Sequence, residues 1–210
     1  ILLDLVRMKM KNHIIISLLF LSVGCSTFQK EYDINNITER NGVYVKKFSD
    51  EKVNGKVFQM VDDMKVPIGK MKNGKKDGLW TSWYENGQKE SEETFKDGKR
   101  DGLGTWWYEN GQKKDEFTWK DGKVDGTWKW YWSNGTKMKE GNWKDSKLDG
   151  LWTEWNENGR KKIKGINKDG RRDGLWTWWY ENGQKKEEVT FKDGEMISGK
   201  KWNKDGTVKE

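Results

Sequence analysis

Residues 77–100 read DGLWTSWYENGQKESEETFKDGKR, and this 24-residue pattern recurs four more times along the chain. The units begin at Asp77, Asp101, Asp125, Asp149 and Asp173, each followed by glycine. A series of Asn-Gly pairs has the same 24-residue spacing, at Asn86-Gly87, Asn110-Gly111, Asn134-Gly135, Asn158-Gly159 and Asn182-Gly183. Self-similarity at a fixed period is the signature of a repeat architecture, in which each unit contacts only its neighbours. We therefore expect an array that offers a long surface rather than an enclosed pocket.

Each unit contains turn signals separated by short runs rich in aromatic residues. Asn-Gly between β-prone runs predicts a two-residue type I′ hairpin turn, because both central positions of that turn need positive φ. The strand from Leu79 to Tyr84 is expected to turn at Asn86-Gly87 and to return along Lys89 to Lys96. The next turn is expected to use Asp97-Gly98 and Asp101-Gly102. The prediction is an all-β fold, an elongated single-layer antiparallel β-meander of 24-residue hairpin repeats.

The turn length also predicts which side chains share a face of the sheet. With a two-residue turn, Tyr84 lies opposite Lys89 and Trp80 lies opposite Glu93. Side chains alternate along a strand, so one face collects most of the aromatic residues and is expected to form the core. Its predicted members include Trp80, Phe95, Trp106, Phe117, Trp119, Trp128, Trp130, Trp143, Trp176, Trp178, Val189 and Phe191.

The opposite face is half polar, and it carries one aromatic residue in most units. A single sheet has two faces and only one of them needs to be covered, so these residues are candidates for binding a partner. They are Trp83, Trp107, Trp155 and Trp179. Tryptophan is enriched at the centres of protein interfaces, which favours a protein partner. Stacking on a glycan is the alternative.

Residue types exclude several kinds of chemistry. The only histidine is His13 and the only cysteine is Cys25, so no Ser-His-Asp or Cys-His arrangement and no ordinary zinc site can form downstream. Calcium needs several oxygens converging in one short loop, and the repeated Lys-Asp-Gly-Lys turns place lysines beside their aspartates. Glycoside hydrolysis needs two acids at one separation in a cleft. We expect no catalytic residue, no metal and no cofactor.

Composition is compatible with a folded protein that has a thin core. The chain is 32% hydrophobic and 36% charged, which by itself would favour disorder, but its 15 Trp, 7 Phe and 6 Tyr supply large areas to bury. The formal charge is +7, and basic and acidic residues are interleaved through the repeats. Nucleic-acid binders cluster their basic residues on one face, so we do not expect nucleic acid as a partner.

The N-terminus has the organisation of an export signal. Basic residues precede the apolar run 14–21, and Ser22-Val23-Gly24-Cys25 follows it. This tetrapeptide resembles the lipobox of bacterial lipoproteins, which implies lipidation of Cys25 and a membrane anchor. By the same resemblance, Ser26 after the cysteine favours the outer membrane. The residues before Met8 or Met10 are interpreted as upstream translation foreign to the native protein.

The pattern predicts five regions along the chain. Residues 1–24 form the signal peptide, and residues 25–51 the lipidated N-terminus and a tether with little to bury. Residues 52–76 are interpreted as a degenerate capping repeat and residues 77–194 as the five full units. Residues 195–210 form a partial C-terminal cap, since terminal units of an array are atypical.

The unit also resembles a known family. Asp-Gly-Leu-Trp-Thr-x-Trp-Tyr-Glu-Asn-Gly-Gln-Lys-Lys followed by Phe-Lys-Asp-Gly-Lys is similar to the bacterial variant of the MORN repeat, found in proteins labelled YwqK-type antitoxins. The resemblance covers roughly residues 52 to 206. It implies a twisted β-sheet that serves as a scaffold for protein contacts, with lipid contacts proposed for some eukaryotic relatives. Departures are Gly104, Ser146, Asn156 and Asn167, the last two thinning the aromatic stripe of the fourth unit.

These observations lead to one functional prediction and one alternative. The prediction is a non-enzymatic envelope lipoprotein whose sheet binds another protein. The family label would add an antitoxin function, which on an exported protein requires a toxin met in the envelope. The alternative is a module that binds glycan or cell wall through its regularly spaced tryptophans.

Overall fold

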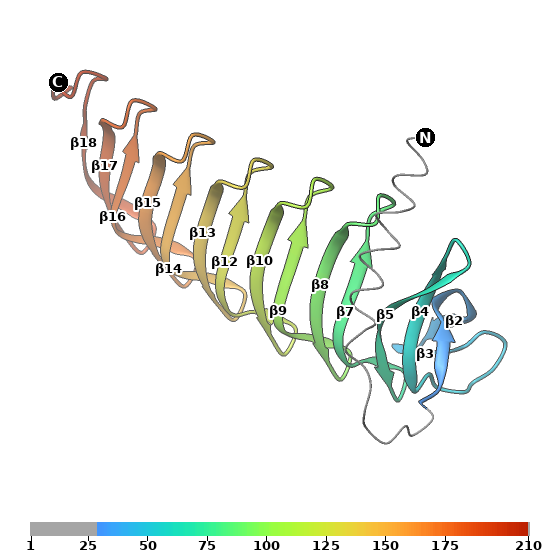
Figure 1. Cartoon of the computed structure of the whole chain (residues 1–210). Helices are drawn as coiled ribbons and strands as arrows, with labels where there is room; N and C mark the ends of the chain where they lie inside the picture. The colour runs from blue at the N-terminus through green and yellow to red at the C-terminus, as the bar shows by residue number, and fades with distance from the viewer. Residues whose placement is uncertain (1–28, 210) are drawn as a thin grey trace, which may run out of the picture.

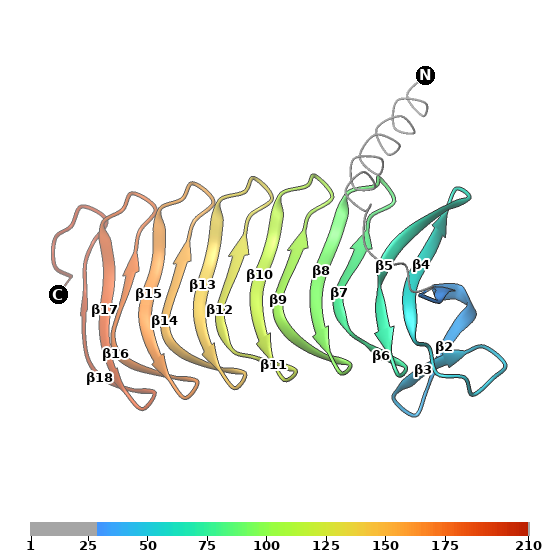
Figure 2. The same cartoon turned by 60° about the horizontal axis from the view of Figure 1, so that its bottom comes forward.

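The computed structural model describes residues 29–209, which form an elongated array of β-hairpins with a small module at its N-terminal end (Figure 1). The predicted fold is confirmed. A 12-stranded sheet contains all five units, and its strands follow chain order from β7 to β18. Neighbouring strands are antiparallel, and the hairpins stand side by side along the array (Figure 2). Within residues 29–209, no second sheet or helix covers either face of this long sheet.

The strands of the long sheet are β7 (Gly78–Trp83), β8 (Lys89–Lys96), β9 (Lys99–Trp107), β10 (Lys113–Lys120), β11 (Lys123–Val124), β12 (Gly126–Tyr131), β13 (Lys137–Lys144), β14 (Lys147–Trp155), β15 (Lys161–Lys168), β16 (Arg171–Trp179), β17 (Lys185–Lys192) and β18 (Glu195–Lys201). The N-terminal module contains β1 (Glu31–Asp33), the 3-10 helix η1 (Ile34–Asn36), β2 (Ile37–Arg40), β3 (Val43–Lys46), β4 (Gly55–Val61), β5 (Met64–Lys72) and β6 (Lys75–Lys76).

The Asn-Gly loops differ from the predicted two-residue turns. Gly87 N–H donates to the Tyr84 carbonyl and Tyr84 N–H to the Gln88 carbonyl, while only Gly87 has positive φ, at 80°. This is a type I turn followed by a left-handed glycine, the longer hairpin connection with a bulge. Lys89 therefore pairs with Trp83, and the prediction that it pairs with Tyr84 is wrong. The register shifts by one between Ser82 and Trp83, so the predicted pair of Trp80 with Glu93 is confirmed.

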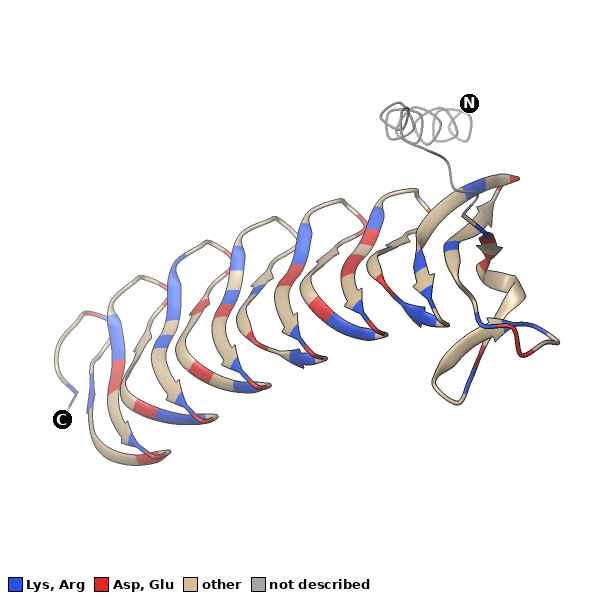
Figure 3. Ribbon diagram, turned by 90° about the horizontal axis from the view of Figure 1, so that it is seen from below, with Lys and Arg blue, Asp and Glu red and all other residues tan. Residues whose placement is uncertain are grey.

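The two-residue type I′ turns lie instead at the first Asp-Gly pair between units. Asp97 and Gly98 have φ of 50° and 83°, and Lys96 pairs with Lys99 across them. The second pair, Asp101-Gly102, lies within β9 and makes no turn, contrary to the prediction. Gly102 has φ of 112°, next to a register shift in the pairing of β8 with β9, so it marks a bulge that bends the strand. Bent strands of this kind recur in every unit (Figure 3).

The predicted aromatic face forms the core of the array. Trp80, Phe117 and Trp176 are buried, and neighbouring rings stack, as Trp106 does on Phe117 with centroids 4.6 Å apart. Several indoles lie over a glycine of the preceding strand. A Cβ atom at Gly165 would stand 2.1 Å from Cδ2 of Trp176, so no larger residue fits there without a shift. Indole and glycine thus alternate across strands and keep a one-layer core closely packed.

Gly104 stands where the other units have Trp80, Trp128, Trp152 and Trp176. The ring of a neighbouring residue, Trp106, lies beside this glycine. A Cβ atom here would stand 2.8 Å from Cζ3 of Trp106, the ring that stacks on Phe117. The aromatic stripe of the fourth unit is thinner, as predicted, because Asn156 and Asn167 stand where other units have aromatic residues. Asn167 is buried with its Nδ2 unpartnered among the described residues, and Nδ2 of Asn156 is likewise buried without a partner there.

The segment expected to be a tether is folded from Glu31 onward. Its strand β1 pairs with β4, and β2 pairs with β3. Tyr32 and Ile37 are buried in one core with the fully buried Val53, Val57 and Met71, and Val45 is buried as well. A few apolar side chains in a polar segment suffice here because Val53 and strands β4 and β5 bring further apolar residues to the same cluster.

The module joins the first unit through Trp80. This indole packs over Gly69 of β5, where a Cβ atom would stand 2.4 Å from the ring, and its Nε1–H donates to the Lys70 carbonyl at 3.0 Å. At the other end, β18 pairs with β17, and the Asn203–Thr207 turn repeats the loop geometry of the full units. Each end of the array is therefore covered by a modified unit.

Tyrosine hydroxyls connect successive units along one end of the hairpins. The Tyr84 hydroxyl donates to the Trp107 carbonyl at 2.7 Å, and Tyr108 and Tyr180 make the equivalent bonds at 2.8 and 2.9 Å. The side chains of Asn86, Asn110, Asn134 and Asn182 also donate to a carbonyl of the following loop. The bonds span one repeat, so they fix the spacing of units rather than the shape of one hairpin.

We expect Tyr108→Phe to lower the free energy of unfolding by about 1 kcal/mol, because it removes one such hydrogen bond and little else. Asn156→Tyr in the fourth unit should have the opposite effect, since it supplies the hydroxyl that this unit lacks. Urea unfolding followed by far-ultraviolet circular dichroism measures both changes. Equal midpoints for Tyr108→Phe and the natural sequence would show that the bond contributes nothing.

Candidate binding surface

The face opposite the aromatic core carries the four predicted partner-binding residues, and we call it the ladder face. Trp83, Trp107, Trp155 and Trp179 each end the outgoing strand of a unit, at β7, β9, β14 and β16. Trp83 is 40% exposed and the other three are half-buried. Tyr131 occupies the equivalent position of the third unit. Successive positions are two strands apart, a separation of about 10 Å. The structure thus arranges these rings in one row along the array.

Lysines of one unit lie over the rings of the next. The Lys89 Nζ atom lies 5.8 Å from the centroid of the Trp107 ring, and Lys137 Nζ lies 5.1 Å from that of Trp155. Such cation–π contacts are worth about 0.5–1 kcal/mol at exposed sites. The row is therefore an alternation of indoles and ammonium groups, with one side of some rings already occupied.

Beside the aromatic row runs a polar row that crosses the whole sheet in register. Its members are Thr81, Glu92, Thr105, Glu116, Lys129, Glu140, Thr153, Lys164, Thr177, Glu188 and Lys200. Thr105, Thr153 and Thr177 are buried between their neighbours although no layer covers this face. Cross-strand pairs are the unit of sheet stabilisation, so this row holds adjacent units in register.

Each of the four carboxylates of the polar row pairs with the lysine three residues earlier. Glu92 pairs with Lys89 at 2.5 Å and Glu140 with Lys137 at 2.7 Å. Glu116 has two partners, Lys113 at 2.5 Å and Lys129 at 3.2 Å. Basic and acidic residues are interspersed along most strands of the array, as Figure 3 shows. Strand β15, residues 161–168, is an exception, because it contains lysines but no acidic residue.

Hydrogen bonding from Lys113 holds the pKa of Glu116 below its usual value. A carboxyl group whose folded-state pKa is lowered stabilises the protein above its unfolded pKa, and this contribution is lost as the pH falls through the folded pKa. We expect Glu116→Gln to lower the free energy of unfolding at pH 7 by less than about 1 kcal/mol, since solvent screens the pair. At pH 3 the two proteins should differ less. A difference that grows on acidification would contradict this origin.

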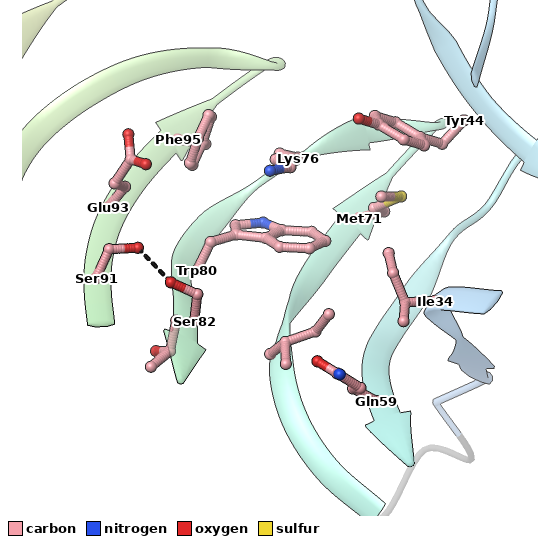
Figure 4. A pocket seen from close by; sticks show the side chains of 12 residues that line it. Ile34, Tyr44, Gln59, Met71, Lys76, Trp80, Ser82, Ser91, Glu93 and Phe95 are labelled. Carbon is pink, nitrogen blue, oxygen red and sulfur yellow. Dashed lines mark hydrogen bonds between the residues drawn. The ribbon is translucent and has the colours of Figure 1, made fainter. Parts of the chain in front are cut away.

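An open hollow of about 330 Å³ lies where the N-terminal module meets the first unit (Figure 4). The Lys76 Nζ atom lies 4.5 Å from the Trp80 ring centroid and 4.8 Å from that of Phe95, and burial lowers the pKa of Lys76. Ser82 and Ser91 are hydrogen-bonded to each other at 2.7 Å on its wall. The hollow therefore lies at the junction between the N-terminal module and the first unit.

The structure also bears on membranes and metals within residues 29–209. No helix in this range is long and apolar enough to cross a membrane. Nowhere in the same range do three acidic, histidine or cysteine side chains gather closely enough to hold a metal ion. The predicted lipidation site, Cys25, and the predicted signal peptide, residues 1–24, lie outside the described residues.

One feature of the ladder face was missed by the sequence reasoning. The fourth unit carries Lys164 and Ile166 where other units carry Glu and a polar residue. Aligning the five units at their 24-residue spacing is sufficient to find both. The glycines under the indoles, Gly69, Gly141 and Gly165, were missed as well, because their role depends on contacts between strands.

Comparison with known families agrees with the fold. Residues 76–97, 100–121, 124–145 and 172–193 match the MORN repeat variant. The matched segments correspond to the first, second, third and fifth units, and the fourth unit lies outside them. No curated protein matches the chain significantly. The chain is therefore a β-repeat protein in which four segments match the MORN repeat variant.

Proposed function

We propose that this protein is a non-enzymatic scaffold whose ladder face binds another protein. The observation that carries the proposal is the row formed by Trp83, Trp107, Trp155 and Trp179 along one uncovered face of a single-layer sheet. Tryptophan rings provide large contact areas at low entropic cost, and the interleaved ion pairs give the polar surroundings typical of an interface. MORN-variant units also occur in this chain as an array, which favours a long contact surface over a catalytic cleft.

The test is a cross-linked pull-down from the native envelope with the full chain and Cys25 intact, with mass spectrometry to identify what is captured. One stoichiometric partner is expected, and it should be lost with the double variant Trp107→Ala/Trp179→Ala. The double variant Lys114→Ala/Lys186→Ala is the matched control, since it alters exposed residues of the same two units. Circular dichroism checks that both variants fold. Retention of the partner by the tryptophan variant would remove the row from the interface.

We further propose that lipidation at Cys25 anchors the scaffold in the cell envelope, with the outer membrane as the predicted location. The sequence from the apolar run to Cys25 supports this, as described above. Cys25→Ser should move the protein from the membrane fraction to the soluble fraction and abolish labelling with a palmitate analogue. Unchanged fractionation would contradict the anchor.

Glycan binding is the second candidate, favoured by the exposure of Trp83 and by the regular spacing of the rings. Against it, Lys89 and Lys137 lie over the rings of Trp107 and Trp155, so a sugar would have to displace them. Saturable retention on peptidoglycan, lost in Trp107→Ala/Trp179→Ala, would support this candidate. Equal retention of both proteins would eliminate it.

The antitoxin function implied by the family resemblance is a narrower form of the scaffold proposal. It requires the bound protein to be a toxin in the envelope. Deletion of this protein should then be toxic only while a neighbouring gene is intact. Harmless deletion in both backgrounds would leave a scaffold without antitoxin function.

A further inference from the structure

The returning strand of the fourth unit, β15, has a charge pattern unlike that of any other unit. Residues 161–168 contain Lys161, Lys162, Lys164 and Lys168 but no acidic residue. Position 164 belongs to the polar row, where the equivalent residues are Glu92, Glu116, Glu140 and Glu188. Lys161 occupies the position of the lysine that pairs with these carboxylates in the other units. The fourth unit therefore places two ammonium groups where the others place an ion pair.

The neighbours of this lysine pair do not compensate its charge. Lys164 stands opposite Thr153 on one side and Thr177 on the other. Within residues 29–209, neither Lys161 nor Lys164 has a carboxylate within ion-pair distance, whereas the equivalent lysines Lys89, Lys113, Lys137 and Lys185 all do. Like charges side by side on a sheet are destabilising, so an external anion between them would remove an unfavourable interaction.

An apolar surface lies directly beside the two lysines. Ile166 is 50% exposed, and it is flanked by Leu151 of β14 and Leu175 of β16, which are 43% and 52% exposed. The positions equivalent to Ile166 hold Thr94, Thr118, Asn142 and Thr190. The three aliphatic side chains, both lysines, Thr177 and Trp179 line one open hollow of about 400 Å³. Ile166 thus places an exposed aliphatic side chain between Leu151 and Leu175, where the other units have a polar residue.

We propose that this hollow is the docking subsite for an acidic peptide segment of the partner, with a carboxylate between Lys161 and Lys164 and an aliphatic side chain against Ile166. The proposal rests on the scaffold function and names its partner's chemistry. Charge complementarity favours an anion, and the hollow of about 400 Å³, which the aliphatic side chains also line, has room for a hydrophobic group beside it. The rest of the ladder face alternates in sign, which suits a local peptide contact better than a flat anionic bilayer.

The test uses the full chain and two fluorescein-labelled peptides with blocked ends, one alternating Glu and Leu and the other alternating Lys and Leu. Fluorescence anisotropy gives their dissociation constants. The test variants are Lys164→Glu and Ile166→Thr, which install residues found at the same positions of other units and so should fold. Lys56→Glu in β4 is the control, because it makes the same charge change at an exposed site in the other sheet.

The acidic peptide should bind, and Lys164→Glu should weaken it at least tenfold. Ile166→Thr should weaken it several-fold, and Lys56→Glu should leave it unchanged. Equal binding of the two peptides, or an unchanged constant for Lys164→Glu, would overturn the proposal. Vesicles of anionic lipid serve as a third probe. If they bind through Lys164 while the acidic peptide does not, the site recognises a membrane and the peptide proposal fails.

Failure of this subsite is distinguishable from failure of the scaffold function. If capture of the partner depends on Trp107 and Trp179 but is unchanged by Lys164→Glu, only the subsite proposal is overturned. Absence of any captured partner would overturn the scaffold function, whatever the peptide does.

Discussion

Trp176→Ala should lower the free energy of unfolding by about 3–5 kcal/mol, the cost of emptying a large buried site. The Trp176 side chain is 3% exposed and contacts Gly165 beneath it. The Arg172 guanidinium lies 4.5 Å above the ring centroid, and Nε1–H donates to the Ile166 carbonyl at 2.8 Å. The substitution removes all of these contacts, and a one-layer sheet has no second layer that could move in to fill the space.

Chemical unfolding at 25 °C, followed by circular dichroism, measures this loss. Leu175→Ala is the matched control, because Leu175 is the adjacent residue on the opposite face and is 52% exposed. Its substitution should cost less than about 1 kcal/mol, since little apolar area is lost from contact. Similar effects of the two variants would contradict the assignment of the core to the aromatic face.

Gly165→Val should be the second largest effect, a loss of about 3 kcal/mol. The backbone of Gly165 does not have positive φ, and valine favours strands, so local preferences alone would make this substitution stabilising. The opposing effect is steric. A Cβ atom would stand 2.1 Å from Cδ2 of Trp176 and 2.4 Å from Cε2, so the indole would have to leave its position.

The double variant Gly165→Val/Trp176→Ala isolates this contact. With the indole removed, the valine has room, and the double variant should be less destabilised than the sum of the two single variants by more than about 1 kcal/mol. Lys162→Val on the same strand is the control for strand propensity, since Lys162 is exposed. Additive effects of Gly165→Val and Trp176→Ala would mean that the clash does not control stability.

Much of the fold could be predicted because the relevant information is local. The 24-residue period fixes the number of units, and alternation along each strand separates Trp80 from Trp83. The predicted turn at Asn86-Gly87 is present, but its predicted two-residue length was wrong, and the predicted faces are nevertheless right. The longer loop adds one residue and the bulge at Trp83 absorbs it, so pairs such as Trp80 with Glu93 are unchanged.

Which glycine pair makes the two-residue turn could not be read from composition. Asn-Gly and Asp-Gly both favour a type I′ turn. The choice depends on hydrogen bonds outside each turn. Gly98 N–H donates to the Lys76 carbonyl of the preceding unit, and Asn86 donates to the Glu109 carbonyl of the next. Residues one repeat away therefore decide the geometry of each loop.

The folding of the predicted tether, from Glu31 onward, was missed for a related reason. Residues 31–46 contain few apolar side chains, which is why they resemble a tether. Tyr32 and Ile37 become buried only because Val53, Val57 of β4 and Met71 of β5 lie in the same cluster. The composition of a segment indicates how much apolar surface that segment can bury by itself. It gives no information on the apolar residues that distant segments add to the same core.

By itself, the sequence determined the repeat period, the all-β class, the two faces of the sheet and the candidate row of tryptophans, since turn residues and alternation act within a few residues. The tertiary structure alone decided which glycines lie under indoles and which residues form the polar row. It also decided that Lys161, Lys164 and Ile166 line one hollow with Leu175 and Trp179. These contacts join strands of different units, and their geometry follows from register and bulges that no single unit specifies.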